Sequence, residues 1–314
     1  MPIALIDIGT NTFNLLVAEL RENGSFNKIY KTRVPVGMGR GGIMKNHIQE
    51  EAFRLGIETL AEYKRTADKY GAGRIIAYAT AAVRDADNGN DFAGEALRQT
   101  GISITVIDGN REAELIWSGI REAVPLKKEP VLIMDIGGGS AEFIIAGREK
   151  IFWKKSFRLG VIRILEAFRP SDPLLADDIL KIENFFMTEL SPLFIAAKYN
   201  PVKILVGSAG SFETMADLIE WHVHKKTFMR SNKSCKLKQI DFLKIYGWLV
   251  QSTLKERLDN KVIPVFRADT IHLAAILIHT VLKNIPVSKI WVSAYSLREG
   301  MLFENRSPFK LPDR

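Results

Sequence analysis

The sequence is short of cysteine and of long hydrophobic runs. Its 314 residues contain one cysteine, Cys235, which rules out an internal disulfide and a zinc site built from several cysteines. No stretch approaches the roughly 18 consecutive apolar residues of a membrane span, and the N-terminus MPIALIDIG lacks the basic start of a signal peptide. We therefore expect a cytoplasmic protein with no membrane partner.

Low-complexity tracts and long Pro/Gly/Ser linkers are also missing. Hydrophobic residues make up 46% and charged residues 25% of the chain, as in an ordinary globular enzyme. The chain is longer than the roughly 250–300 residues at which a single core stops growing, so we expect two domains joined by a hinge. The predicted bounds are 1–121 and 122–298, with residues 299–314 free to pack back on the first domain.

Acidic residues are under-represented only in the second part of the chain. The net charge is +8, yet residues 1–120 hold 14 Lys and Arg against 15 Asp and Glu, whereas residues 121–314 hold 30 against 21. The densest basic run extends from His222 to Lys238 and contains no acidic residue; its basic residues are Lys225, Lys226, Arg230, Lys233, Lys236 and Lys238. This run indicates either a polyanionic partner or a solvated loop that serves only solubility.

One motif occurs twice. The stretch IDIGTNTFNLLVA starts at Ile6 and MDIGGGSAEFIIA starts at Met134, and each predicts a strand, a tight turn and a second strand. Strands and helices alternate around both copies, which favours an α/β fold with two similar domains and a cleft between them. The pattern predicts helices within 49–71, 92–101, 110–124, 177–194 and 211–221, and strands at 74–80, 102–108, 131–136 and 202–207.

The repeated turn suits phosphate. A glycine lets a ligand approach the backbone, and successive turn N–H groups can form a concave nest for phosphate oxygens. The predicted phosphate-binding residues of the two turns are Gly9, Thr10, Asn11, Gly137, Gly138, Gly139 and Ser140. Asp7 and Asp135 end the preceding strands, and a carboxylate beside phosphate requires a hard cation, which predicts Mg²⁺ bound by these two residues. The alternative is a pair of ordinary hairpins with Asp-capped turns.

A third glycine-containing turn, VGSAGSFETMA, begins at Val206, follows a predicted strand and opens a predicted helix. Backbone N–H groups at the helix start, together with Ser208, Gly210 and Ser211, would bind anions through the positive end of the helix dipole. An ordinary helix N-cap is the alternative reading of the same residues.

Eight segments together carry a resemblance to a known family. They are DIGTNTFNLL, ATAAVRDADN, IDGNREAELIWSG, DIGGGSAEF, FRLGVIRI, GSAGSFETMA, RADTI and SAYSLREGML. With these segments in this order, the chain resembles the exopolyphosphatase/guanosine pentaphosphate phosphohydrolase family, a branch of the actin-like superfamily. The resemblance implies two actin-like (ribonuclease H-like) domains with a phosphate-binding cleft between them. It also implies Mg²⁺-dependent release of terminal phosphate from polyphosphate, guanosine pentaphosphate or both.

The resemblance also implies residue roles. The catalytic glutamate of the family falls on Glu112, a second functional glutamate on Glu142, and a phosphate-binding arginine on Arg84. Glu112 has an independent physical case, since the start of a helix favours the ionised carboxylate that a general base needs. An exposed first-turn Glu is the alternative for Glu112, and a surface salt bridge to Asp85 or Asp87 is the alternative for Arg84.

The sequence departs from the family pattern in two places. The family usually has an acidic residue in the glycine-rich turn where this chain has Arg40, and the chain ends soon after SLREGML, without the helical domains of longer members. What those domains add is then absent or supplied by a second subunit, as in a homodimer. An ATP-dependent kinase and a non-catalytic polyphosphate or alarmone-binding regulator are the alternative functions. No guanine-reading motif is identifiable, and no specific nucleic-acid partner is expected.

Two further pairs have a structural and a functional reading. Arg267 and Asp269 of RADTI form either a site or a structural ion pair, and the latter is favoured. His222 and His224 would lie on one side of a strand, but no third metal ligand is visible beside them.

Overall fold

The computed structural model describes residues 1–21, 25–225 and 233–305. The chain divides into two compact units: unit 1 contains Met1–Gly119 and the residues from Leu297 on, and unit 2 contains Ile120–Ser296. The bounds predicted from the sequence are 1–121 and 122–298. Among the described residues, no helix combines the length and the apolarity that a membrane span requires.

Unit 1 contains a five-stranded sheet whose strands lie in the order β3-β2-β1-β4-β5. The first three strands are antiparallel neighbours, whereas β4 and β5 run parallel to β1. The strands are β1 (Ile3–Ile8), β2 (Phe13–Leu20), β3 (Phe26–Val34), β4 (Arg74–Ala79) and β5 (Ile104–Val106). The helices are η1 (Ile43–Lys45), α1 (Glu50–Lys69), α2 (Ala81–Arg84), α3 (Gly89–Thr100), α4 (Gly109–Ile120) and α12 (Leu297–Glu304).

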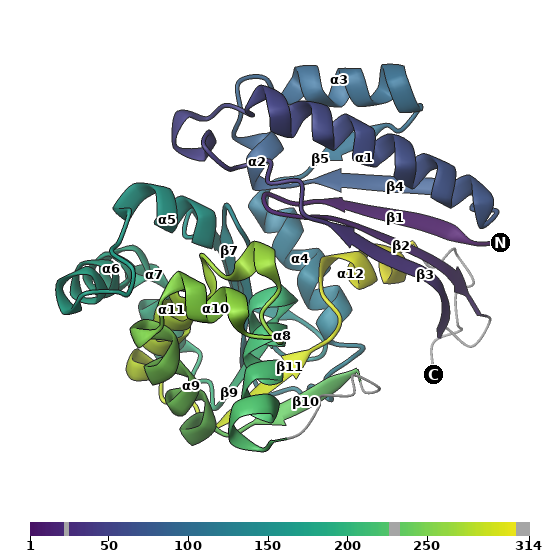
Figure 1. The fold of residues 1–314 in the computed structure, drawn as a ribbon. Helices are drawn as coiled ribbons and strands as arrows, with labels where there is room; N and C mark the ends of the chain where they lie inside the picture. Colours follow the sequence, from purple (N-terminus) through teal and green to yellow (C-terminus); the bar gives the residue numbers. More distant parts are fainter. Residues whose placement is uncertain (22–24, 226–232, 306–314) are drawn as a thin grey trace. The chain divides into compact units, whose positions relative to one another are not determined.

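Alternation along β1 separates the two faces of this sheet. Ile6 and Ile8 belong to a core cluster that also contains Leu60 of α1, and successive strand residues point to opposite faces. Asp7 therefore lies on the other face of the sheet from α1. Figure 1 shows α1 and α3 on one side of the sheet and α4 and α12 on the other.

Unit 2 repeats this strand order. Its sheet has the order β10-β11-β9-β6-β7-β8. From β8 inwards, the third, second, first and fourth strands of the unit follow one another as in unit 1, β11 takes the place of β5, and β10 is added at the edge. The parallel and antiparallel pairings also correspond. The two units are thus α/β domains that share one sheet topology, which agrees with the two similar domains that the sequence predicts. The strands are β6 (Val131–Ile136), β7 (Ala141–Ala146), β8 (Ile151–Phe157), β9 (Ile204–Ser208), β10 (Ser234–Leu237) and β11 (Lys289–Ser293).

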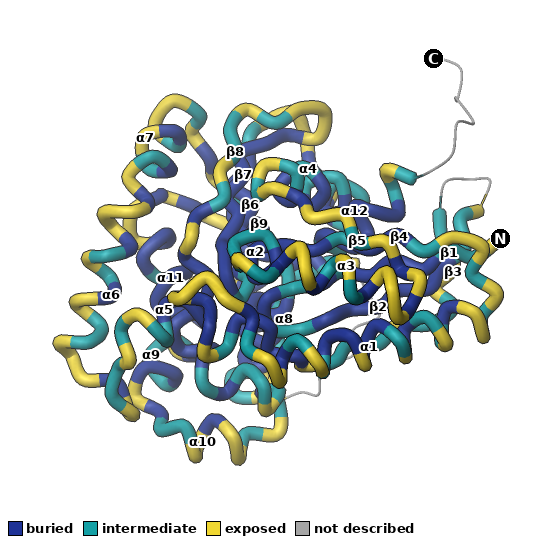
Figure 2. The backbone as a smooth tube through the Cα atoms, turned by 90° about the horizontal axis from the view of Figure 1, so that it is seen from above, coloured by how far each residue is buried: buried dark blue, intermediate teal, exposed yellow. Residues whose placement is uncertain are grey.

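The centre of unit 2 is buried and mostly apolar. Every residue of β6 and β7 is buried, and Figure 2 shows both strands in dark blue. Helix α11, whose sequence IHLAAILIHTVLKN is mostly buried, contributes to the same core cluster. The helices of this unit are α5 (Val161–Phe168), α6 (Ala176–Glu189), α7 (Ser191–Tyr199), α8 (Ala209–Leu218), η2 (Ile219–Val223), α9 (Gln239–Gln251), α10 (Leu254–Asp259), η3 (Val265–Arg267) and α11 (Ile271–Asn284).

Each predicted helix and strand is present, although the strand predicted at 102–108 is confined to Ile104–Val106 and the α-helix predicted at 211–221 ends at Leu218. Two further differences concern the type of element. The helix expected over 177–194 is two helices that meet at Leu190, because Pro192 at the start of α7 has no N–H for a continuous helix. His222 and His224 do not lie on a strand. The segment forms a π-helical turn in which His222 stacks on Trp248, with ring centres 5.0 Å apart, and His224 lies 3.3 Å from Asp241.

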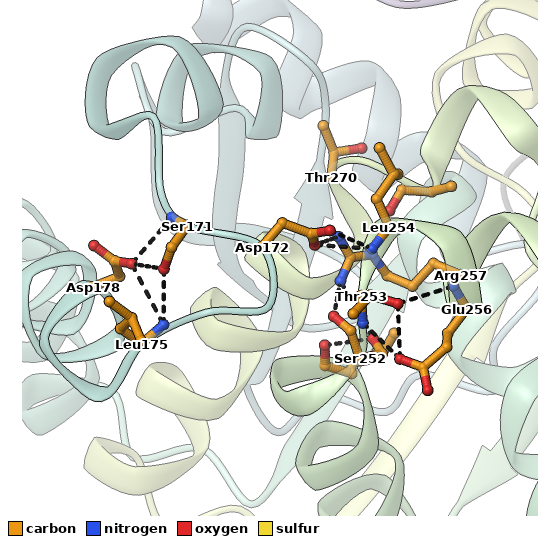
Figure 3. Close-up of polar contacts among 12 residues, drawn as sticks. Ser171, Asp172, Leu175, Asp178, Ser252, Thr253, Leu254, Glu256, Arg257 and Thr270 are labelled. Atoms are coloured by element: carbon orange, nitrogen blue, oxygen red, sulfur yellow. Dashed lines mark hydrogen bonds and ion pairs between the residues drawn. The ribbon is translucent and has the colours of Figure 1, made fainter.

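A buried arginine joins three loops of unit 2. Arg257 is 2% exposed; its Nε donates to the carbonyl of Ala268 at 2.6 Å, and a terminal nitrogen contacts Asp172 at 2.8 Å. Asp172 also accepts from the amide of Leu254 at 2.7 Å, and Arg257 donates to the carbonyl of Ser252 (Figure 3). The guanidinium therefore stabilises the packing of segments that are distant in the sequence.

The burial of His272, next to this cluster, predicts that the folded protein becomes less stable as the pH is lowered. Burial, with the charge of Arg257 as a second cause, lowers the pKa of His272 to about 3. The folded protein keeps this side chain neutral while the unfolded chain protonates it below about pH 6.5, so the free energy of unfolding falls as the pH is lowered from 6.5 towards 3. We expect His272→Leu to reduce the slope of the free energy of unfolding against pH by about 1.4 kcal/mol per pH unit. Denaturant titrations of both proteins between pH 7 and 4.5 check this, and parallel curves would assign the acid sensitivity to other groups.

Candidate functional site

Four polar residues form a row across the sheet of unit 2. Asp135 pairs with Ser208 of β9 on one side and with Glu142 of β7 on the other, and Glu142 pairs with Ser156 of β8. Residues that are direct cross-strand partners share one face of a sheet. The register therefore places two carboxylates side by side at the end of β6, with a serine beyond each of them.

Both carboxylates of this row are buried and accept hydrogen bonds from hydroxyls. Glu142 is 1% exposed and accepts from the Ser156 hydroxyl at 2.7 Å. Asp135 is 6% exposed and accepts from the hydroxyls of Ser208 and Ser296, the latter at 2.6 Å. Burial raises the pKa of Asp135, and the two serine hydrogen bonds oppose that rise. A cation beside this carboxylate pair would relieve the cost of burying two like charges.

The equivalent row in unit 1 has a different charge. Asp7 pairs with Asn14, and Asn14 pairs with Arg33. Arg33 Nε donates to the Asn14 side-chain oxygen at 3.0 Å, and the Asn14 amide donates to Asp7 at 3.0 Å. Asn14 thus stands where unit 2 has Glu142, and the row contains one carboxylate and one guanidinium. Because the row of unit 2 contains two carboxylates, it fits a divalent cation better than the row of unit 1.

The glycine turn of unit 2 is held by the residues that begin α5. The carbonyl of Gly137 accepts from the amide of Val161 at 3.0 Å, and that of Gly138 from Ile162 at 2.9 Å. Gly160 permits this contact, because a Cβ there would lie 2.4 Å from backbone atoms of the turn. In a planar trans peptide the N–H points away from the C=O. The amides of the following residues are therefore directed away from α5.

These amides are available for a ligand. Within the part of the chain that the structure describes, no protein atom accepts a hydrogen bond from the amides of Gly138, Gly139 or Ser140. The turn is closed by the amide of Gly137, which donates to the Ser140 carbonyl at 3.0 Å. Successive N–H groups on one side of a turn bind anions such as phosphate.

The turn of unit 1 has the same construction. The amide of Gly9 donates to the Thr12 carbonyl at 3.2 Å, and the carbonyls of Thr10 and Asn11 each accept at 3.0 Å from Gly39 and Gly37, respectively. The segment that holds the turn again follows the third strand of its sheet. Gly37 has a φ of +70°, and the Arg40 side chain lies back over it, with Cδ 3.3 Å from the position of a Cβ on Gly37.

Glu112 lies near the start of α4 and is 8% exposed. Its carboxylate lies 3.5 Å from a terminal nitrogen of Arg84. Arg84 also contacts Asp85 at 3.3 Å and the carbonyl of Ile107 at 3.2 Å, so it combines a salt bridge to Asp85 with a contact to Glu112. The interpretation of Glu112 as an exposed first-turn residue is wrong, because the side chain is buried against Arg84.

The third turn of the sequence analysis begins α8. The Ser208 hydroxyl donates to Asp135, so this side chain supports the carboxylate row. Gly210 is covered by Arg267, because a Cβ at residue 210 would overlap the guanidinium, which also donates to Thr214 at 3.1 Å. Ala209, between Ser208 and Gly210, adopts a φ of +62°. Arg267 therefore packs on the turn that the sequence analysis assigned to phosphate.

Sequence reasoning missed four supporting side chains: Arg33, Ser156, Arg163 and Ser296. Ser156 reaches Glu142 through the register of β7 and β8, and Arg33 reaches Asn14 through that of β2 and β3. Arg163 and Ser296 lie outside the strands, and the packing of their segments brings them to Gly139 and Asp135. Two of the four had a signal, since Arg163 belongs to the FRLGVIRI segment and Ser296 to the SAYSLREGML segment. Among the described residues, no three His, Cys, Asp or Glu side chains cluster as metal ligands. Mg²⁺ usually keeps several waters and binds through one or two carboxylates and substrate phosphates, so Asp135 and Glu142 fit such an ion.

Comparison with protein families gives one match over most of the chain. A family model described as the Ppx/GppA phosphatase family matches residues 16–307. Among curated proteins, the chain is 22% identical over 303 residues to Exopolyphosphatase 1 of Mycobacterium leprae, with 96% of this chain and 88% of that protein covered. It is 33% identical over 227 residues to the bifunctional 3-dehydroquinate synthase/phosphatase of Fusobacterium nucleatum, which covers 69% of this chain and only 34% of that longer protein.

Solved structures show the same fold. A crystal structure of an exopolyphosphatase from Cytophaga hutchinsonii has a TM-score of 0.94 and 37% identity, covering 96% of this chain and 97% of the other. The Aquifex aeolicus PPX-GPPA enzyme has a TM-score of 0.80 at 24% identity, covering 97% and 99%. The second likeness concerns the fold alone.

Proposed function

The chain belongs to the Ppx/GppA phosphatase family, and from this premise we propose that it is a Mg²⁺-dependent phosphohydrolase that releases terminal phosphate from inorganic polyphosphate, guanosine pentaphosphate or both. Likeness to an exopolyphosphatase structure at 37% identity supports polyphosphate as a substrate. The observation that carries the proposal is the glycine turn of unit 2. Its three amides lie between Asp135, near the end of β6, and Glu142, near the start of β7, which form a buried carboxylate pair.

The proposed roles follow from the chemistry of each group. The turn amides bind phosphate oxygens, and Arg84 adds bidentate donors suited to phosphate. Asp135 and Glu142 would hold the cation, which when bound neutralises charge on the phosphate oxygens. Asp7, the other metal ligand that the sequence predicts, is the equivalent of Asp135 in unit 1.

Glu112 is the proposed general base. It takes a proton from water as the water oxygen bonds to the terminal phosphorus. The anhydride P–O bond breaks, and its electron pair leaves with the shortened chain.

Phosphate release tests this function against its alternatives. Purified protein is incubated with Mg²⁺ and polyphosphate, guanosine pentaphosphate or ATP, and free phosphate is measured over time. A phosphohydrolase releases phosphate without a further acceptor, whereas a kinase releases little from ATP until its acceptor is added. A regulator binds the polyanions without turnover. No release from polyphosphate or guanosine pentaphosphate would reject the proposal.

Basic side chains on the β10 edge predict a dependence on chain length. Lys226 and Arg230 of the basic run lie outside the described residues, but Lys233 and Lys236 are exposed and lie over the rings of Tyr295 and Trp291, at 5.6 and 4.9 Å. Tyr295 precedes Ser296, which donates to Asp135. If these lysines bind distal phosphates, replacing both by serine raises KM for long polyphosphate more than for tripolyphosphate and flattens the salt dependence only for the long chain.

Lys150 provides a matched control for this test. Like the β10 lysines, Lys150 is exposed and lies over an aromatic ring, that of Phe152 at 4.9 Å. It lies in the turn after β7, at the opposite end of that strand from Glu142. Lys150→Ser should leave KM for both substrates unchanged. Equal changes for long and short substrates in the double variant would assign the β10 lysines to solubility.

A further inference from the structure

Arg163 is a buried charged residue that the proposed chemistry does not use. It is the third residue of α5 and is 7% exposed. Its side-chain Nε donates to the carbonyl of Gly139 at 3.2 Å, and its backbone amide reaches the carbonyl of Gly138 at 3.3 Å. A guanidinium thus lies directly against the glycine turn of unit 2, on the side opposite to the directed amides.

The internal repeat shows what is particular about this contact. In each unit a strap follows the third strand, residues 36–40 in unit 1 and 159–163 in unit 2, and both straps contain Gly-x-x-Arg. The straps begin alike, with the amides of Val36 and Leu159 donating back to the last residue of their strands at 3.1 and 2.7 Å. Arg40 and Arg163 therefore occupy equivalent positions.

The two straps differ at the last carbonyl of the turn. In unit 1 the carbonyl of Asn11 accepts from the backbone amide of Gly37 at 3.0 Å. In unit 2 the equivalent carbonyl, that of Gly139, accepts from the side chain of Arg163. The turn of unit 2 thus depends on a side chain for a contact that the backbone supplies in unit 1.

This contact acts on the peptide that links Gly139 to Ser140. The carbonyl accepts a hydrogen bond from a charged donor, and the N–H of the same planar peptide belongs to Ser140. A hydrogen bond to a carbonyl polarises the peptide and strengthens its N–H as a donor. The guanidinium therefore both fixes the direction of the Ser140 amide and increases the positive potential at it.

We infer that Arg163 is a positioning residue for the anion-binding turn, which holds the Gly139–Ser140 peptide so that the Ser140 amide donates to a bound phosphate group. The inference rests on the proposed function only in that the turn binds phosphate. A hydrogen bond with a charged partner contributes more free energy than one between neutral groups. Loss of the guanidinium should therefore weaken phosphate binding roughly tenfold or more.

Calorimetric titration with tripolyphosphate and Mg²⁺ tests this inference without turnover. The host protein is Glu112→Gln, which removes the proposed base, and Arg163→Met and Arg163→Lys are introduced into it. We expect Kd to rise roughly tenfold or more for Arg163→Met. Arg163→Lys, which keeps the charge but not the guanidinium geometry, should give a smaller rise. Unchanged affinity in Arg163→Met below its Tm would overturn the inference.

Arg257→Met is the matched control. Arg257 is also buried and bonded to backbone carbonyls, but its contacts are Ser252, Ala268 and Asp172 and not the turn (Figure 3). Both Met variants should lower Tm, and only Arg163→Met should change Kd. Equal weakening in the two variants would show a general effect of instability and reject the positioning role. Tight, Arg163-dependent binding with no phosphate release by the unsubstituted protein would reject the proposed hydrolysis and support the inference.

Discussion

Glu112→Gln is expected to lower turnover by roughly 10²- to 10⁴-fold, the contribution of a general base, while tripolyphosphate binding stays close to that of the parent. The amide keeps the shape of the buried carboxylate beside Arg84 but cannot accept the proton of the attacking water. Steady-state phosphate release gives kcat, and calorimetry gives the affinity.

Glu114→Gln is the control for this variant. Glu114 lies on the same helix, but its side chain is 42% exposed and its contact is Arg111 at 3.3 Å. Its replacement should leave kcat within about twofold of the parent, because a surface ion pair contributes little. Turnover of Glu112→Gln close to that of the parent would remove Glu112 from the role of base.

Removal of the metal is the second large effect. Phosphoryl transfer spreads charge over three oxygens, so excess chelator should abolish phosphate release, and added Mg²⁺ should restore it. Full activity in excess chelator would contradict the metal requirement.

The two carboxylate rows predict unequal effects of substitution on this requirement. Asp135→Asn should raise the Mg²⁺ concentration for half-maximal activity on the order of 10- to 100-fold, since loss of groups that only support metal ligands already costs this much. Asp7→Asn should have a smaller effect, because Asp7 accepts a hydrogen bond from Asn14, which Arg33 supports. A larger effect of Asp7→Asn would place the cation at unit 1.

The hairpin turns could be predicted from the sequence because their signals are local. An Asp at a strand end, a glycine two residues later and short apolar runs lie within a dozen residues of one another, so the sequence itself indicates Asp7, Gly9, Asp135 and Gly137. The register of the two hairpins agrees with that prediction. The long helix α1 was equally clear from its apolar periodicity.

The supporting side chains could not be predicted in this way. Arg163 contacts a turn 24 residues earlier and Ser296 contacts a carboxylate 161 residues earlier, and both contacts depend on strand order and strap geometry. Strand β8 alternates intermediate and exposed residues at the sheet edge, so its apolar signal is weak and Ser156 was not placed. The π-helical turn at His222 arises from tertiary packing against Trp248, which local propensity does not encode.

Hydrolysis in ¹⁸O-labelled water tests the central claim most directly. If water attacks the terminal phosphorus of polyphosphate, each released phosphate contains one oxygen from the solvent and the shortened chain contains none. Mass spectrometry of the phosphate released in a single turnover measures this. One labelled oxygen in each released phosphate is the predicted result. Label in the remaining chain, unlabelled phosphate, or no release at all would contradict terminal hydrolysis by this protein.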